Sequence, residues 1–433
     1  MKKAFAAASL FFLFLAAAAQ AVAGPRIEHW RAPSGAQVFF VESRAVPVID
    51  VQIDFPAGDA FAPADKAGLA GLVRGLLDAG TGELDENQLA DRLADTGAIL
   101  GGGTDLDRAS VALRSLSAPR EREAALELLR LLLQQPVFPA AVLEREKARA
   151  IAAIREADTR PASIATKRFF AALYPGHPYG QSATAESVGR IGREDVVAYY
   201  RARYAARGAT VSIVGDLARA EAEALAQRLT EGLPAAASGD VLPEVAPPAP
   251  AILRIEHPAS QAHILLGQPA LRRGDADHFP LFVGNYIFGG GGFASRLMKE
   301  VREKRGYAYS VYSYFQPQKQ PGPFVIGLQT RRDQAGAALE VVERVLRDFL
   351  ARGPDEAELR AARRNLADGF PLRIDSNGKL LEYVAMIGFY GLPLDYLDDF
   401  PRKVEAVTAA DIRAAFARHV RPEALVTVIV GGE

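Results

Sequence analysis

The sequence contains no cysteine, and its charge is nearly balanced. Without cysteine, the 433-residue chain cannot form disulfide bonds, thiolate metal sites or lipid-anchored cysteines. Its 51 Lys and Arg residues are matched by 52 Asp and Glu residues, which gives a formal net charge of −1. Such a balance gives no electrostatic reason to bind nucleic acid or an anionic membrane, so we expect neither as a partner.

Long hydrophobic runs are missing after the first residues. The start, MKKAFAAASLFFLFLAAAAQAVAG, has two lysines, an apolar stretch from Ala4 to Ala19, and small residues at Ala21 and Ala23. This pattern predicts a signal peptide over residues 1–23, with cleavage after Ala21 as an alternative. No later stretch approaches the 18 uncharged apolar residues of a membrane span. We therefore expect a soluble, exported protein, periplasmic or secreted.

The remaining chain is too long for one hydrophobic core, so at least two domains are expected. Residues 233–252 contain five prolines and no periodic apolar pattern, which predicts an extended linker between domains at 24–232 and 253–433. The segments starting at Gly192 and Thr408 align without a gap at a constant offset of 216 residues. Each is a helix pattern followed by a buried strand, and this indicates an internal duplication.

The two halves also open alike. Val51 to Phe55 alternates as a half-buried strand, as does the run from His263, and a helix pattern follows each of them. Strands, then helices, then a returning strand predict the α+β class. We expect two domains, each a mostly antiparallel sheet with helices packed on one face.

One continuous stretch, Gly289 to Phe315, is expected to form a loop, a helix, a tight reversal and a strand. Ser295 is a good N-cap and Gly306 a helix terminator, after which alternation puts Tyr307, Tyr309, Val311, Ser313 and Phe315 on one side of a strand. Arg302 and Tyr309 can then converge, and two donors aimed at one point suit a carbonyl oxygen that gains negative charge. Alternatively, Arg302 only complements the helix C-terminus and Tyr309 only suits a strand.

A second unusual stretch is the helix expected from Gly68 to Leu77. Gly71 and Gly75 lie in its interior, where each costs about 1 kcal/mol relative to alanine. Either a neighbouring element packs closely against these small residues, or the glycines replace residues of another kind.

Jointly, these features resemble the insulinase (pitrilysin) family of zinc metallopeptidases, in the small two-domain branch that includes the mitochondrial processing peptidase. The resemblance covers nearly the whole chain after residue 23. It is carried by the duplicated halves, the proline-rich linker, and the segments GLAGLVRGLLDAGT, HPYG, VGD, VGG and GGGGFASRLMKEVREKRGYAYSV. It implies a clamshell of two domains.

The family's inverted zinc motif, H-x-x-E-H, is absent here. The resemblance places Gly71 and Gly75 at the two histidine positions and Arg74 at the glutamate. The third ligand position falls at Ala152 or Ala153. We therefore expect no metal and no cofactor in this chain.

The remaining candidate ligands do not rebuild such a site. No two of the six histidines have the i, i+4 helical spacing: His29, His177, His257, His263, His278 and His419. Glu146 and Glu156 remain near the third ligand position, but a carboxylate without imidazoles is no zinc site. For His177 we expect a role in shaping a turn with Pro178 and Gly180.

The resemblance does preserve Arg302 and Tyr309, which match a pair that holds the substrate carbonyl in active members. It implies a zinc-less subunit of a heterodimeric peptidase, whose homologous partner carries H-x-x-E-H and the zinc. The alternatives are a non-catalytic peptide-binding or scaffold protein, and an independently active peptidase, which would contain stoichiometric zinc.

Two glycine pairs are the candidate contacts for a peptide substrate. Gly290 and Gly291 belong either to a flexible loop that lets a peptide approach the backbone or to a helix end and connector. Gly102 and Gly103 lie in residues 98–116, which form either an exposed edge strand that a peptide can extend or an ordinary sheet strand.

Overall fold

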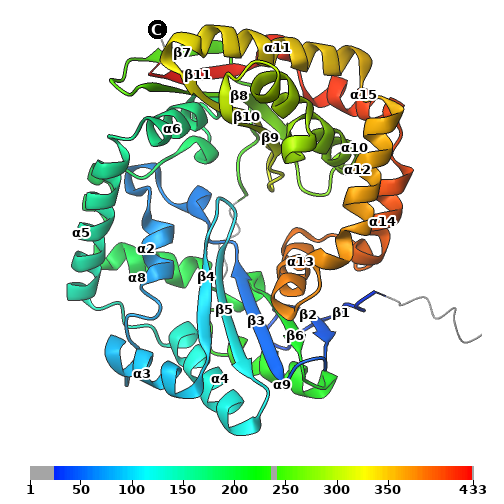
Figure 1. Cartoon of the computed structure of the whole chain (residues 1–433). Coiled ribbons are helices and arrows are strands. Elements are labelled where there is room, and N and C mark those ends of the chain that lie inside the picture. Colours follow the sequence, from blue (N-terminus) through cyan, green and yellow to red (C-terminus); the bar gives the residue numbers. More distant parts are fainter. Residues whose placement is uncertain (1–23, 236–240, 432–433) are drawn as a thin grey trace, which may run out of the picture.

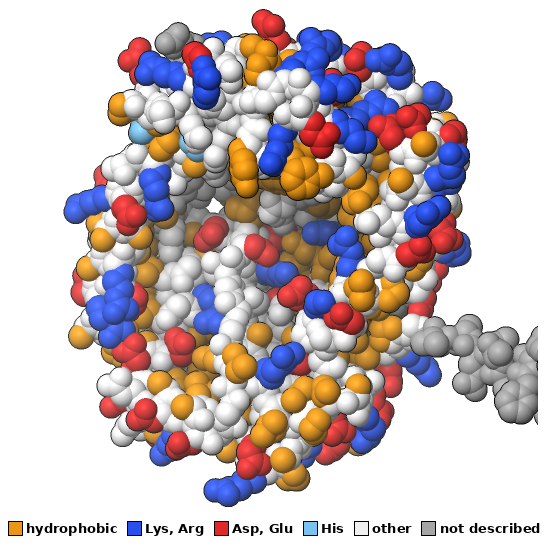
Figure 2. All heavy atoms as spheres, viewed as in Figure 1, with side chains coloured by type: hydrophobic (Ala, Val, Ile, Leu, Met, Phe, Trp, Pro, Cys, Tyr) orange, Lys and Arg blue, Asp and Glu red, His pale blue; other side chains and the backbone are white. Residues whose placement is uncertain are grey.

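The computed structural model describes residues 24–235 and 241–431. The predicted signal peptide lies outside the described residues. The chain forms two lobes around a central hollow, and each lobe is built on one sheet (Figures 1 and 2). Within these described ranges, no helix is long and apolar enough to span a membrane.

The first sheet has six strands in the order β1-β2-β6-β3-β5-β4. Their bounds are β1 Glu28–Arg31, β2 Gln37–Glu42, β3 Val48–Phe55, β4 Ile99–Thr104, β5 Ala109–Leu116 and β6 Thr210–Gly215. Strand β6, between β2 and β3, is buried along its whole length, whereas buried residues alternate with more exposed ones along β5. Strand β4 is paired only with β5, so it is a free edge.

The second sheet repeats this plan with five strands in the order β7-β11-β8-β10-β9. Their bounds are β7 Ala251–Ile255, β8 Gln261–Leu271, β9 Ala308–Phe315, β10 Gly322–Arg331 and β11 Val426–Val430. The β2–β6 and β7–β11 pairs are parallel, and all other pairs are antiparallel. Strands β2-β6-β3-β5-β4 therefore correspond to β7-β11-β8-β10-β9, and edge strand β4 corresponds to edge strand β9. The predicted duplication and the α+β class are confirmed.

Helices cover both sheets. In the first half they are α2 Leu69–Gly75, α3 Glu86–Thr96, α4 Pro119–Gln134, α5 Ala140–Ala157, α6 Pro161–Leu173, α7 Ala185–Gly189, α8 Arg193–Arg203 and α9 Arg219–Thr230. In the second half they are α10 His278–Asn285, α11 Ala335–Arg352, α12 Glu356–Asp368, α13 Asn377–Tyr390, α14 Tyr396–Ala406 and α15 Ala409–His419. Short 3-10 and π turns complete the chain.

The two halves exchange one helix each, a feature that the sequence did not predict. Helix α6 packs on β8 and β11 of the second sheet, and helix α13 packs on β2, β3 and β6 of the first. The fit is close, because a Cβ on Gly388 of α13 would lie only 2.6 Å from the Phe39 ring. Each sheet thus has its own helices on one face and a helix of the other half on the opposite face.

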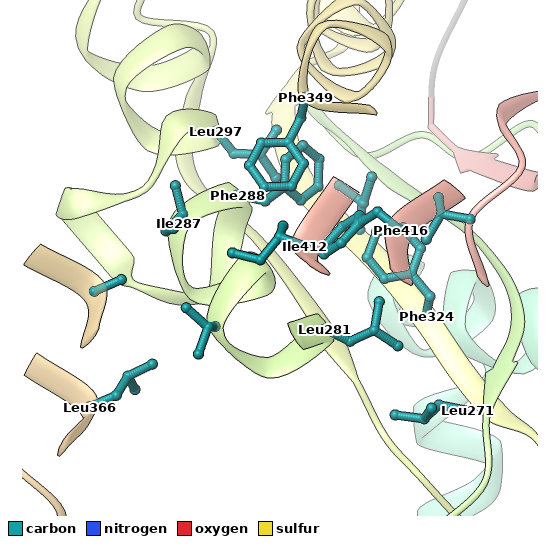
Figure 3. Packing of buried hydrophobic residues seen from close by; sticks show 14 of the residues in the cluster. Leu271, Leu281, Ile287, Phe288, Leu297, Phe324, Phe349, Leu366, Ile412 and Phe416 are labelled. Carbon is teal, nitrogen blue, oxygen red and sulfur yellow. The ribbon is translucent and has the colours of Figure 1, made fainter. Parts of the chain in front are cut away.

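The core of the second lobe supports the glycine-rich stretch. Phe416 of α15 packs against Phe349 of α11 with 4.9 Å between ring centroids, and Phe288, which directly precedes the glycines, lies 5.4 Å from Phe349 (Figure 3). These rings are almost fully buried. The packing of these rings therefore fixes the position at which the glycine-rich stretch begins.

The lobes join where the turns of the two edge hairpins meet. Asp107, in the β4–β5 turn, is fully buried and accepts hydrogen bonds from the Tyr179 hydroxyl and from the Lys319 backbone N–H, the latter at 2.8 Å. His177 shapes the turn as expected, because its Nδ1 accepts from the Tyr179 backbone N–H at 3.0 Å. Its Nε2 lies 3.0 Å from the carbonyl oxygen of Pro243 in the linker. The HPYG motif is therefore part of the junction between the lobes.

Of the predicted linker, residues 241–250 contain no helix or strand, and β7 begins at Ala251.

Candidate functional site

Edge strand β9 carries Tyr309 and is interrupted by a bulge at that residue. Ala308 pairs with Thr330 and Val311 with Leu328, so Tyr309 and Ser310 together face the single residue Gln329. The extra residue shifts the alternation: Tyr309 is 81% exposed, whereas Val311 is buried. The expectation that these two residues share one side of the strand is therefore wrong, because a bulge re-aims the side chain at which it occurs.

Arg302 and Tyr309 lie together, as the sequence suggested. Arg302 lies in a π-helical turn, Met298–Glu303, and the chain reverses into β9 at Gly306, whose backbone is left-handed (φ 65°). The Arg302 guanidinium donates through Nη1 to the Tyr309 carbonyl oxygen at 2.7 Å, and its Cζ lies 4.6 Å from the centroid of the Tyr309 ring. The arginine therefore stacks on the phenol ring, and the two groups do not point into separate environments.

A third side chain, Phe293, completes this arrangement and was not foreseen. The Cζ atom of Arg302 lies 4.9 Å from the centroid of the Phe293 ring, which is 64% exposed. The guanidinium is thus in contact with two aromatic rings, each contact being worth about 0.5–1 kcal/mol at an exposed site. We call Phe293, Arg302 and Tyr309 the Arg–aromatic cluster. The aromatic residue within GGGGF was the only signal in the sequence that could have pointed to Phe293.

Gly290 and Gly291 lie at the end of a π-helical turn, Tyr286–Gly290. A Cβ on Gly290 would lie 2.5 Å from the Asn285 side chain, and one on Gly291 would lie 2.5 Å from the Tyr286 carbonyl oxygen. The preceding helical turn thus requires glycine at both positions, which favours the helix-end interpretation. Their contact with a peptide remains a prediction.

Gly102 and Gly103 lie on β4, which is the exposed edge of the first sheet. Gly102 is left-handed (φ 103°), and a Cβ there would lie 2.2 Å from the Ser110 carbonyl oxygen of β5. Gly103 faces open space, since a Cβ on it would have no heavy atom of the described chain within 4 Å. The stretch thus includes an edge strand of the sheet, and its extension by a peptide remains a prediction.

Both free edges end at the junction between the lobes. The turn that follows β4 contains Asp107, and the turn that follows β9 contains Lys319, and these two residues are hydrogen-bonded at 2.8 Å. Both edges therefore reach the same junction: Gly102 and Gly103 lie near the end of β4 that meets it, whereas the Arg–aromatic cluster lies at the opposite, starting end of β9.

The helix face on which the resemblance places the zinc ligands is not covered by any neighbouring element in the described chain. Gly71 and Gly75 of α2 are both exposed. A Cβ on Gly75 would meet no described atom within 4 Å, and one on Gly71 would meet only the Thr104 hydroxyl at 3.8 Å. Close packing of a neighbouring element therefore does not explain these glycines.

Arg74, at the glutamate position, is buried and has a structural role. Its Nε donates to the Ser110 carbonyl oxygen of β5 at 2.6 Å, and its Nη2 donates to the Gly101 carbonyl oxygen of β4. Burial lowers the pKa of this guanidinium. Arg74 thereby ties α2 to the edge hairpin.

These residues do not fit a zinc ion. Glycine offers no side-chain ligand, and a guanidinium has donors only. Ala152 and Ala153 are exposed on α5, which packs near α2. Glu146 is paired with Arg145 and Arg149 at 2.9 and 2.8 Å, so this nearby carboxylate is already neutralised.

One group of possible metal ligands was missed because its members are distant in sequence. Asp275, Asp277 and His419 bring their ligand atoms within 4.8 Å of one another. However, both carboxylate oxygens of Asp277 accept from Arg418, at 2.6 and 2.8 Å, and His419 Nε2 lies 2.9 Å from the same carboxylate. Arg418, and secondarily His419, lower the pKa of Asp277. The group is therefore an ion-pair network.

Known proteins match this chain over most of its length. Residues 38–186 match the family described as insulinase (peptidase family M16), and residues 190–366 match the description "Peptidase M16 inactive domain". A crystal structure titled as a peptidase M16 inactive domain from Pseudomonas fluorescens is 36% identical, with a TM-score of 0.90, over 94% of this chain and 98% of that one. The chain belongs to the M16 peptidase family.

Two further similar proteins are a non-peptidase homologue and a protease. The "Non-peptidase homolog YmxG" of Helicobacter pylori is 24% identical over 100% of this chain and 99% of its own length. The periplasmic protease PqqL of Escherichia coli shares the fold, with a TM-score of 0.80 at 16% identity, over 94% of this chain and 46% of that one. The present protein is thus an M16 homologue, and its sequence contains no H-x-x-E-H motif.

Proposed function

We propose that this M16 homologue is the zinc-less subunit of an exported, heterodimeric peptidase. A homologous partner would carry H-x-x-E-H and the zinc, and this chain would bind the peptide substrate and stabilise the reacting carbonyl oxygen. The observation that carries the proposal is the Arg–aromatic cluster, in which Arg302 contacts Tyr309. By contrast, Gly71 and Gly75 of α2, at the positions that the resemblance gives to zinc ligands, have no side chains that could bind a metal.

The geometry of Arg302 supports such a role. The Tyr309 carbonyl oxygen engages only Nη1 of the guanidinium, and an arginine has five N–H donors. The phenol of Tyr309 is 81% exposed, so its hydroxyl is accessible to a bound peptide. Donors held in place before the reaction stabilise a developing oxyanion without the cost of reorganisation.

The two free edges support binding of an extended peptide. Edge strands β4 and β9 offer unpaired backbone groups, and a peptide can add to such an edge as a further strand. Gly102 and Gly103 would let the peptide approach β4 closely. Gly290 and Gly291 directly precede the segment that contains Phe293, and they would let a peptide approach the backbone there. Two edges that reach one junction suit one extended substrate.

The test is peptide cleavage by a mixture of this chain and an H-x-x-E-H homologue from the same source. Arg302→Ala is expected to lower kcat about 10²–10³-fold, the effect of removing one oxyanion donor, and Tyr309→Phe is expected to lower it less. Arg305→Ala is the matched control, because Arg305 lies at the same helix end but bonds to Glu300 at 2.8 Å. Unchanged kcat in Arg302→Ala, or stoichiometric zinc in the purified single chain, would contradict the proposal.

A second candidate function is peptide holding without chemistry, in a binding or scaffold protein. It is favoured by the bond that Arg302 already makes within its own chain, and by the name of the Helicobacter pylori relative. This function predicts that the chain alone binds extended peptides and that no mixture with an H-x-x-E-H homologue changes their rate of cleavage.

A further inference from the structure

A pocket of about 470 Å³ lies in the second lobe, away from the Arg–aromatic cluster. It is formed by the β8–α10 connection, the α13–α14 connection, the end of α14 and the start of α15. We call it the α10–α14 pocket, and its lining includes Arg273, His278, Phe279, Leu392, Tyr396 and Lys403. The volume falls within the range of about 300–1,000 Å³ that is typical of small-molecule sites.

Most of the pocket wall is apolar. The centroids of the Phe279 and Tyr396 rings lie 6.0 Å apart, and Pro280, Leu392 and Pro393 also line the pocket. These side chains come from segments more than 100 residues apart, so only the folded chain creates the surface. An apolar group of a ligand would contact aromatic rings and prolines in this pocket. Because these side chains are rigid, they lose little conformational entropy when the ligand binds.

Arg273 is the exceptional group in this wall. Its Nε is buried and has no hydrogen-bond partner within the described chain. No carboxylate of the described residues lies within ion-pair distance of it, and its Cζ lies 5.1 Å from the centroid of the Tyr390 ring. Burial lowers the pKa of this guanidinium. The Arg273 side chain as a whole is half-buried. A charge that is partly withdrawn from water is normally paired, and Arg273 has no ion-pair partner among the described residues.

The other charged groups around the pocket already have partners. Lys403 pairs with Asp399 at 3.4 Å. Asp411 accepts from the Thr408 hydroxyl at 2.6 Å, and Asp275 accepts from the Asp277 backbone N–H at 2.8 Å.

The ring groups of the pocket add no charge. His278 lies 3.4 Å from the Tyr396 hydroxyl, and burial lowers its pKa to about 4, so the imidazole is neutral at pH 7. Of the cationic side chains that line the pocket, Arg273 is thus the one without an ion-pair partner among the described residues.

We propose that the α10–α14 pocket binds an apolar group that bears a carboxylate. The carboxylate pairs with the Arg273 guanidinium, and the apolar group lies against Phe279, Leu392 and Tyr396. Two sources have this chemistry: the C-terminal residue of a peptide, and a free aromatic or aliphatic acid. Arginine suits both because its planar fork matches a carboxylate.

Calorimetric titration of the purified single chain tests the proposal independently of any peptidase activity. The probes are N-acetylphenylalanine and a hexapeptide that ends in phenylalanine, each compared with its C-terminal amide, and acetate as the minimal anion. At least one of the two probes with a free C-terminal carboxylate, N-acetylphenylalanine or the hexapeptide, is expected to bind at least tenfold more tightly than its C-terminal amide and than acetate. Binding of the hexapeptide alone assigns the pocket to peptide ends, and binding of N-acetylphenylalanine alone assigns it to small acids.

Variants then locate the site. Arg273→Gln is expected to weaken binding about 10- to 100-fold, and Arg273→Lys to restore part of it. Arg272→Gln, which removes the same charge from the preceding residue, is the matched control, since Arg272 pairs with Glu244. Ala406→Trp, which fills the pocket from an exposed lining position, keeps Arg273 and is expected to abolish binding.

Thermal unfolding separates binding from folding. Because the Arg273 guanidinium has no hydrogen-bond or ion-pair partner in the described chain, and its contact with the Tyr390 ring is weak, Arg273→Gln is expected to leave the Tm of the ligand-free protein unchanged or raised. Equal affinity for acid and amide, normal binding by Arg273→Gln or by Ala406→Trp, or no binding of any probe would overturn the proposal.

Discussion

Replacing Arg74 by methionine tests whether the residue at the lost glutamate position now holds the first lobe together. Methionine keeps most of the length and the apolar stem of arginine but removes every donor. The Ser110 and Gly101 carbonyl oxygens would lose the Arg74 guanidinium as their donor. Both oxygens belong to the edge hairpin β4–β5, so the contact between this hairpin and α2 would weaken.

The expected cost follows from these two bonds. A hydrogen bond from a charged donor contributes about 1.5–3 kcal/mol, so losing two costs about 3–6 kcal/mol. Removing a buried cation offsets part of this cost, because burial disfavours the charged guanidinium, as the lowered pKa of Arg74 indicates. We expect the free energy of unfolding to fall by about 2–4 kcal/mol, which corresponds to a Tm lower by on the order of 10 °C.

Urea unfolding followed by circular dichroism measures this change, and amide hydrogen exchange locates it. Exchange should accelerate in β4 and α2 before it does so in β6. Arg92→Met, on the exposed face of α3, is the control. The free energy of unfolding of Arg74→Lys should lie between those of Arg74→Met and Arg92→Met. An Arg74→Met protein within about 1 kcal/mol of the unsubstituted protein would refute the reasoning, because a change of that size is typical of ordinary surface substitutions.

The remaining predictions concern single residues. Gly71→Ala should raise the free energy of unfolding by about 0.5–1 kcal/mol, since a Cβ meets only one atom at 3.8 Å; a loss of stability would show that the bare face of α2 is occupied. Gly102→Ala should lower it by more than 1 kcal/mol because of the left-handed backbone and the Ser110 oxygen, and a neutral result would contradict the described edge. The pKa of His278 is lowered to about 4, so the folded protein keeps this imidazole neutral while the unfolded chain takes up a proton below pH 6.5. The free energy of unfolding should therefore fall by up to about 3 kcal/mol as the pH is lowered from 6.5 to 4. In His278→Gln, the free energy of unfolding should change less over this pH range. Phe293→Ala should weaken peptide binding severalfold by releasing Arg302, without changing Tm by more than about 2 °C, and Phe293→Tyr should retain binding.

Much of the fold could be read from the sequence because it rests on local and repeated patterns. The offset of 216 residues predicted two equivalent sheets, and the strands at Thr210 and Val426 occupy equivalent positions in them. The helix start at Ser295 and the reversal at Gly306 depend only on cap and turn chemistry, and they brought Arg302 to Tyr309 as expected. The missing zinc ligands also required no structure, because glycine and arginine cannot bind zinc in any arrangement.

Only the tertiary structure decided what these residues contact. The bulge that exposes Tyr309 arises from the pairing of β9 with β10, and alternation within β9 could not reveal it. The carbonyl acceptors of Arg74 lie 27 and 36 residues away. The pocket around Arg273, in which it has no ion-pair partner among the described residues, is built with segments that follow it by more than 100 residues. The sequence by itself determined which groups the protein carries and which it has lost; their partners, or lack of partners, depended on how the two halves pack together.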